Sequence, residues 1–216
     1  MFYTIQGNDI LIANNKEALS KYYSDVLPLP IDYEAGKYIV QDGILIDNTE
    51  AWTIEQAQAK QKELAEYNYQ QKAKKAYGGI LINNTYLFET NEASQSMITA
   101  SLIGLKDAPD ETTLNWKVYK DNQPLVIPLT KVQLAQLFAF ALNMINTSFG
   151  IEGLRNEALA VATVEELNNE EWVSEYKNVT DLMFNEINNK IDVVLISENV
   201  KEEIDKTISG ETSAEL

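Results

Sequence analysis

The stretch KAKKAYGGILINNTYLFET, residues 72–90, decides the fold because two kinds of secondary structure meet within it. Residues 53–76 are rich in Ala, Gln, Glu and Lys, which are good helix formers. After the glycines, two short apolar runs flank Asn83-Asn84, and asparagine tolerates the left-handed backbone of tight hairpin turns. We therefore expect Gly78-Gly79 to mark the change from a connecting helix to a β-hairpin.

The same glycine pair raises the question of a phosphate-binding loop. A P-loop needs a longer glycine-rich segment that ends in Lys-Ser or Lys-Thr, after a strand and before a helix. Gly78-Gly79 instead follows a predicted helix and precedes a predicted strand, and it lacks that ending. The sequence thus favours a turn, and we predict no cofactor-binding residue and no cofactor.

The sequence after this hairpin predicts a helix, a second hairpin and a core helix. Thr90 or Asn91 is the expected cap of a helix that stops at Gly104. The turn DNQ separates the strand-like runs LNWKVYK and PLVIPL. A capping box from Thr130 to Gln133 then opens a helix whose apolar residues keep a helical period as far as Ile145.

Short strands and turns dominate the N-terminal part of the chain. Apolar runs around Gly7-Asn8-Asp9 and around Asp42-Gly43 each predict a hairpin, since glycine accepts a positive φ at no steric cost. Thr53 and Gln56 fit a capping box at the start of the connecting helix. The five lysines of that helix favour a solvated face over a basic patch.

These patterns predict an α+β fold with four regions. They are a small β module at residues 1–51, a connecting helix at 52–77, a hairpin-helix-hairpin-helix domain at 78–150 and an acidic helical C-terminal region at 151–216.

An apolar stripe of heptad-like spacing runs through the C-terminal region. Its residues are Trp172, Tyr176, Val179, Met183, Ile187, Ile191 and Val194. Such a stripe is typical of a long amphipathic helix packed on its own domain, or of a short coiled coil with other copies of the chain. We take these residues as candidates for a protein interface, with a homo-oligomer as one form of it. A capping box from Thr163 to Glu166 precedes the stripe.

Two absences limit the chemistry. The chain contains no cysteine and no histidine, so it lacks thiolate nucleophiles, Ser-His and Cys-His arrangements and the usual zinc ligands. The neighbouring acids Glu165-Glu166 and Glu170-Glu171 lie on a predicted polar helix surface, whereas glycan hydrolysis needs two carboxylates facing each other across a cleft. We predict no catalytic residue, no metal site and no enzymatic activity.

The net charge of −16 argues against a nucleic-acid partner, because such affinity comes largely from Lys and Arg that neutralise phosphates. Residues 151–216 hold 16 acidic and 5 basic side chains, so most of the excess lies there. This acidic excess is typical of a solvated helical surface, and an acidic DNA mimic is the alternative interpretation. No apolar run approaches the roughly 20 residues of a membrane helix, and residues 1–20 lack a secretory signal, so we expect cytoplasmic synthesis and no membrane partner.

Three segments together resemble a bacteriophage domain of unknown function. They are AYGGILINNTYLFETNEASQSMITASL at residues 76–102, WKVYKDNQPLVIPLTKVQLAQLFAFALNMINTSF at 116–149 and VEELNNEEW at 164–172. That domain occurs in tail-fibre and tail-fibre-assembly type proteins. The segment LPIDYEAGKYIVQDGILIDN, residues 29–48, is similar to the N-terminal half of such proteins.

The resemblance implies a non-enzymatic viral structural protein of the tail, tail fibre or another virion appendage. Its expected location is the virion, after synthesis in the host bacterial cytoplasm, and its expected partners are other phage structural proteins of the tail or fibre. A tail-fibre assembly chaperone that is not retained in the virion is the alternative, and an acidic DNA-mimic inhibitor is the third reading. The resemblance transfers no site to any residue.

Overall fold

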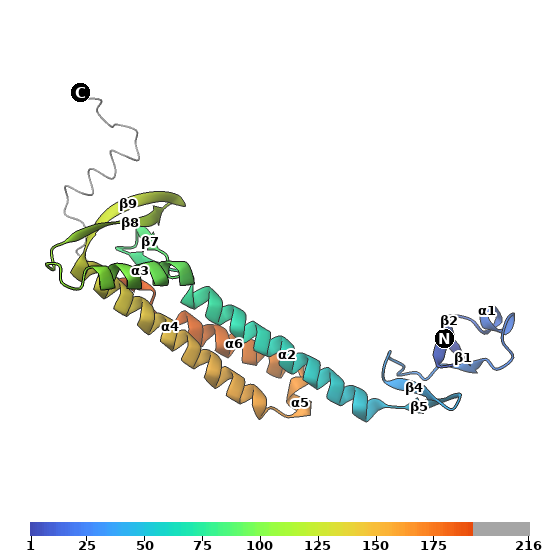
Figure 1. Cartoon of the computed structure of the whole chain (residues 1–216). Coiled ribbons are helices and arrows are strands. Elements are labelled where there is room, and N and C mark those ends of the chain that lie inside the picture. The colour runs from blue at the N-terminus through green and yellow to red at the C-terminus, as the bar shows by residue number, and fades with distance from the viewer. Residues whose placement is uncertain (192–216) are drawn as a thin grey trace, which may run out of the picture. The chain divides into compact units, whose positions relative to one another are not determined.

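A computed structural model describes residues 1–191, and it confirms the predicted α+β class. The chain groups into two compact units. Unit 1 comprises residues 1–64 and 162–174, and unit 2 comprises residues 65–161 together with the described residues from 175 onward. Figure 1 shows the helices and strands of both units, coloured along the chain.

Unit 1 begins with the predicted β module. One sheet has the strand order β2-β1-β3, and β4 pairs with β5 in a separate antiparallel hairpin. Asp42 and Gly43 turn that hairpin with φ values of 52° and 76°, as expected for a two-residue turn with positive φ at both positions. The elements are β1 (Phe2–Gln6), β2 (Asp9–Ala13), α1 (Lys16–Ser20), β3 (Leu27–Pro28), β4 (Tyr38–Gln41) and β5 (Ile44–Asp47).

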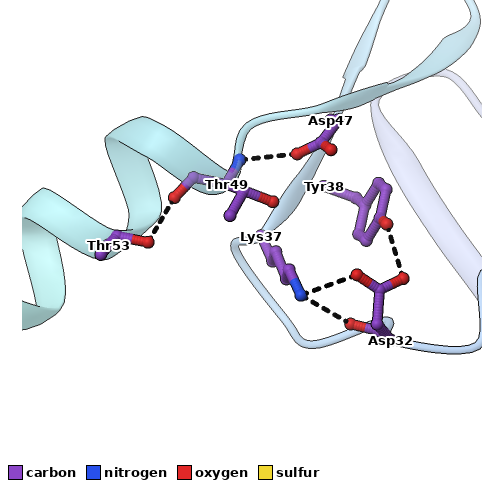
Figure 2. A network of polar contacts seen from close by, with 6 residues as sticks. All are labelled: Asp32, Lys37, Tyr38, Asp47, Thr49 and Thr53. Carbon is purple, nitrogen blue, oxygen red and sulfur yellow. Dashed lines mark hydrogen bonds and ion pairs between the residues drawn. The ribbon is translucent and has the colours of Figure 1, made fainter. Parts of the chain in front are cut away.

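A small polar cluster shapes the chain before β4 (Figure 2). Lys37 Nζ lies 2.8 Å from Asp32 Oδ2, and Tyr38 Oη donates a hydrogen bond of 2.8 Å to Asp32 Oδ1. These bonds, led by the one from Lys37, hold the pKa of Asp32 below its ordinary value. The Tyr38 ring also stacks on Tyr33, with 5.8 Å between ring centroids. The cluster is exposed, so it orients the loop more than it stabilises the fold.

The start of the connecting helix differs from the prediction. Helix α2 (Thr49–Ala76) begins before Thr53, whose Oγ1 donates to the Thr49 carbonyl at 2.7 Å inside the helix (Figure 2). The Asp47 carboxylate accepts a hydrogen bond of 2.8 Å from Thr49 N and so satisfies a free donor of the first turn. The predicted capping box of Thr53 and Gln56 is therefore wrong, because a carboxylate earlier in the chain already serves the helix start.

Unit 2 is built on a five-stranded sheet with the order β10-β6-β7-β8-β9. The pairs from β6 to β9 are antiparallel, and β10 joins β6 in parallel. Both predicted hairpins are confirmed: Asn83 and Asn84 turn the first with φ near 50°, and Asp121 and Asn122 turn the second. The strands are β6 (Ile80–Ile82), β7 (Tyr86–Phe88), β8 (Thr113–Lys120), β9 (Gln123–Thr130) and β10 (Lys190–Ile191).

The core of unit 2 lies between this sheet and two helices. Helix α3 (Glu92–Gly104) is capped by the Asn91 side chain, and α4 (Lys131–Ala160) by the predicted Thr130–Gln133 capping box. Trp116 packs against this core and stacks on Phe88. The fully buried core side chains are Ile80, Ile82, Phe88, Ile98, Val118, Ile127, Leu129, Leu134, Leu137 and Ala141.

Gly78 and Gly79 form the tight turn from α2 into β6 that we expected. A Cβ on Gly78 would lie 2.4 Å from the Lys74 carbonyl oxygen. Gly79 has a φ of +91°, and a Cβ there would lie 2.7 Å from Leu87 Cδ1 and 2.9 Å from the Phe88 carbonyl oxygen. Fully buried Thr90 secures the turn, because its Oγ1 accepts from Gly79 N at 3.1 Å and donates to the Ala76 carbonyl at 2.9 Å.

The helices at the C-terminal end depart from the expected outline. Helix α4 continues through residue 150, where we expected the α+β domain to end. The Thr163–Glu166 capping box is confirmed and opens α5 (Val164–Leu167), and α6 (Glu170–Asn185) follows. Helix α6 stops before Ile187, so the expected continuous stripe as far as Val194 is wrong within the described residues: Ile191 lies in β10, and Val194 is outside them.

Within residues 1–191, only α4 is long and apolar enough to cross a membrane by length and composition. The expectation that no run approaches this length is wrong by that measure, because residues 132–151 include no charged side chain. The inward residues of α4, among them Leu134, Leu137 and Met144, fill the core of unit 2. A core helix passes the same test of length and composition.

Candidate functional site

The outer side of α3 and α4 carries a groove with a single charged lining residue. The groove has a volume of about 680 Å³ and lies between the two helices. Its lining residues are Glu92, Gln95, Ser96, Thr99, Ala100 and Ile103 from α3 and Phe138 and Leu142 from α4. Ile103 is 70% exposed and Leu142 38% exposed, while Phe138 packs partly on the core. The groove therefore offers apolar side chains edged by hydroxyl and amide groups and by the carboxylate of Glu92.

Helix α4 is unusual because it lacks charge between Lys131 and Glu152, on its solvent side as well as on its buried side. The residues between Lys131 and Glu152 contain none of the chain's 50 charged side chains, which are 17 basic and 33 acidic. Exposed positions on this stretch include Val132, at 40% exposure. Uncharged polar residues, among them Gln136, Asn143 and Asn146, share this solvent side with exposed apolar residues, and few charges are typical of the centre of a protein interface. The outer side of α3 and α4 is thus the candidate protein-binding surface, which we call the α3–α4 surface.

The predicted interface stripe lies mostly on α6, away from the α3–α4 surface, and several of its residues are buried or packed against the core. Tyr176 and Ile187 are buried at 4% and 8% exposure, and Met183 and Ile191 pack partly against the core. Val179 and Trp172 are half-buried, Trp172 in unit 1. This arrangement matches the alternative of a helix packed on its own chain, and contacts of the stripe with a second copy stay a prediction.

Sequence reasoning overlooked the α3–α4 surface because it treated α4 only as a core helix. The period of Leu134, Leu137 and Ala141 indicates one buried face, and it says nothing about the opposite face. The signal that could have found the surface is the uncharged run from 132 to 151, which is longer than one buried face requires.

A buried polar network ties α2, α4 and α6 together within unit 2. Asn68 is fully buried, and its Nδ2 donates to Asn156 Oδ1 and to Tyr176 Oη, both at 2.8 Å. Tyr176 Oη donates in turn to the Arg155 carbonyl at 2.7 Å, and Arg155 Nε donates to Thr180 Oγ1 at 2.9 Å. Each bond joins residues from two helices, so the network fixes the helix register where apolar packing alone would permit sliding.

A buried ion pair extends this network toward the sheet. Lys72 Nζ lies 3.0 Å from Glu152 Oε2, and the two side chains are only 7% and 17% exposed. The ammonium group also lies 4.2 Å from the centroid of the Tyr69 ring and 4.4 Å from that of Phe149. The C-terminal half of α2 is thereby held against α4, and the two run alongside each other (Figure 1).

Tyr67 and Asp181 form a further link between α2 and α6. Tyr67 Oη donates a hydrogen bond of 2.5 Å to Asp181 Oδ1. Burial, followed by this bond to a carboxylate, raises the pKa of Tyr67 to about 12. The neutral phenol is therefore the form that the folded chain favours.

This shift predicts a loss of stability at high pH. The unfolded chain releases the Tyr67 proton near pH 10 and the folded chain near pH 12, so the stabilisation is complete below pH 10 and is lost between pH 10 and 12. Denaturant unfolding across this range should show a shallower decline for Tyr67→Phe than for the parent chain. Tyr22→Phe, at a tyrosine that is 79% exposed, is the control and should decline like the parent. Equal slopes for all three proteins would contradict the assignment.

Glu166, from one of the two acidic pairs, is part of the capping box that opens α5. Glu166 accepts hydrogen bonds from Thr163 N at 2.8 Å and Oγ1 at 2.9 Å, and these bonds hold its pKa below the ordinary value. A general acid needs the opposite shift. Among residues 1–191, no group of three or more acidic side chains is placed to hold a metal ion.

Comparisons of the chain with protein-family models, with curated proteins and with solved structures found no match.

Proposed function

We propose that this chain is a non-enzymatic structural protein of a bacteriophage, one that builds or decorates the tail or another virion appendage through protein–protein contacts. The observation that supports a binding role is the α3–α4 surface, whose groove is lined by a single charged residue, Glu92, on an otherwise strongly acidic chain. The resemblance of residues 76–172 to a domain of phage tail-fibre and assembly proteins supports the viral setting.

The composition of the α3–α4 surface fits the centre of a protein interface. Charged residues are depleted in interface cores, and apolar and aromatic residues are enriched there. Leu142 and Ile103 present apolar side chains to solvent beside the partly buried Phe138 ring.

The function is tested with purified phage particles. Mass spectrometry of the phage that encodes the chain should detect it in the finished virion. Detection only in infected cells, together with misassembled fibres after gene deletion, would favour the assembly chaperone and overturn the role as a virion component. Detection in neither setting would contradict both.

Leu142→Asp tests whether the α3–α4 surface makes the contact. A buried, unpaired carboxylate in an interface costs several kcal/mol, so the variant should be incorporated at less than about a tenth of the parent level. Leu182→Asp is the matched control, because Leu182 is 56% exposed on α6 and outside this surface. The measurement is the amount of each variant per particle. Equal incorporation of the two variants would exclude the α3–α4 surface as the contact.

A further inference from the structure

A pocket of about 320 Å³ lies where the ends of α2 and α6 meet the turn into the sheet. Its lining residues are Gln71, Lys74, Lys75, Gly78, Phe184, Asn185 and Asn189. All of them belong to unit 2. The lining thus combines two cationic side chains with three amides and contains no carboxylate.

In the described part of the chain, the positive charges of the two lysines are not balanced by a neighbouring carboxylate, although the protein is acidic overall. Lys37, Lys60, Lys72 and Lys131 each pair with a carboxylate. Among residues 1–191, no carboxylate lies within ion-pair distance of Lys74 or Lys75. Burial, and then the neighbouring charge of Lys74, lower the pKa of Lys75. An anion in the pocket would offset both effects by stabilising the charged ammonium.

The helix dipole does not account for this pair. Lys74 and Lys75 lie in the last turn of α2, where the helix end carries a partial charge of about −0.5. Two ammonium groups carry more positive charge than this helix end can offset. The helix dipole therefore explains only part of the positive charge at the end of α2. The remaining positive charge is available to bind an anionic ligand.

The opposite side of the pocket supplies hydrogen-bond donors. Asn185 ends α6, and Asn189 precedes β10. In the part of the chain that the structure describes, neither side-chain amide has a hydrogen-bond partner, although Asn189 O accepts a bond of 2.8 Å from Leu81 N. The buried Phe184 side chain also lines the pocket. An amide N–H can donate to an oxygen that the ammonium groups hold.

We propose that this pocket binds a single oxyanion group, a phosphate or a carboxylate, between the ammonium groups of Lys74 and Lys75 and the side-chain amides of Asn185 and Asn189. The site is unlike a P-loop, because side chains from α2, from the end of α6 and from the loop before β10 provide the contacts, and the glycine only makes room for the turn. The proposal is independent of the virion role, since it concerns a different surface from α3–α4.

The test is a titration of the full chain followed by ¹⁵N-detected amide signals. Inorganic phosphate and acetate are added separately, with sodium chloride holding the ionic strength constant. The side-chain amides of Asn185 and Asn189 should shift and saturate with at least one of the two anions, and the anion that binds more tightly identifies the oxyanion class. Lys75→Gln should weaken binding about tenfold, the loss of one charge-assisted hydrogen bond.

The control is Lys62→Gln, which removes the same charge from an exposed lysine of α2 outside the pocket. It should leave the affinity unchanged, and amide signals of all variants should keep the dispersion of the folded parent. Shifts that rise without saturation for both anions, or an equal loss of affinity in Lys62→Gln, would overturn the proposal. If Lys75→Gln perturbs the fold, Lys74→Gln takes its place with the same expected result.

Discussion

Replacing Gly79 by alanine is expected to destabilise the chain by about 3 kcal/mol or more. The left-handed conformation at φ +91° costs an L-residue about 1–2 kcal/mol, and the contacts of the new Cβ add about 1–3 kcal/mol. Relief would require movement of backbone, because the Phe88 carbonyl oxygen is only 2.9 Å from the Cβ position. The measurement is the free energy of unfolding by urea, read from far-ultraviolet circular dichroism.

Gly150→Ala is the matched control, and the same substitution should have the opposite sign there. Gly150 lies inside α4, and a Cβ at this position meets no atom within 4 Å. Alanine should therefore stabilise the chain by about 0.5–1 kcal/mol, since glycine loses more backbone entropy on entering a helix. A loss of stability below 1 kcal/mol for Gly79→Ala would mean that the turn tolerates a side chain, contrary to the contacts described.

Glu152→Leu is expected to cost about 3 kcal/mol, because it leaves the Lys72 ammonium buried without its carboxylate. The Tyr69 and Phe149 rings near Lys72 compensate for part of this loss. Combining Glu152→Leu with Lys72→Met should restore most of the stability, since an apolar pair of similar volume replaces two desolvated charges. Unfolding free energies of the parent, both single variants and the double variant give the coupling energy.

The exposed pair Lys60–Glu63 provides the control for this cycle. Its side chains are 27% and 48% exposed, so Glu63→Leu should cost less than about 1 kcal/mol. A double variant of Lys72 and Glu152 that remains as unstable as Glu152→Leu would show that the instability comes from packing and not from an unpaired charge.

The turns and several helix starts could be predicted because their causes are local. Asn83-Asn84 and Asp42-Gly43 adopt positive φ for steric reasons that act within a few residues. The capping boxes at Thr130 and Thr163 likewise need only a side chain three residues away. The start of α2 was predicted wrongly because Asp47, at the end of β5, accepts a hydrogen bond from the first turn of the helix. The sequence pattern indicates Thr53 as the cap, but Thr53 lies inside the helix.

The parallel strand β10 escaped prediction for a different reason. Lys190 pairs with Leu81, more than a hundred residues earlier, and no period in either segment records this contact. Strand β10 comes after α6 has ended at Asn185. The heptad-like spacing of the stripe therefore continues past the end of the helix that we predicted from it. Spacing alone cannot distinguish a helix from two elements that happen to bury the same residues.

Features that depend on neighbouring residues could be predicted from the sequence, whereas contacts between distant residues could not. From the sequence alone follow the α+β class, the hairpins, the glycine turn and the absence of cysteine and histidine chemistry, because each depends on composition or on neighbours along the chain. Only the tertiary structure decided that Lys72 meets Glu152, and that Lys74 and Lys75 face the amides of Asn185 and Asn189. These pairs are far apart in sequence and meet only because helix packing brings their faces together, which no local pattern encodes.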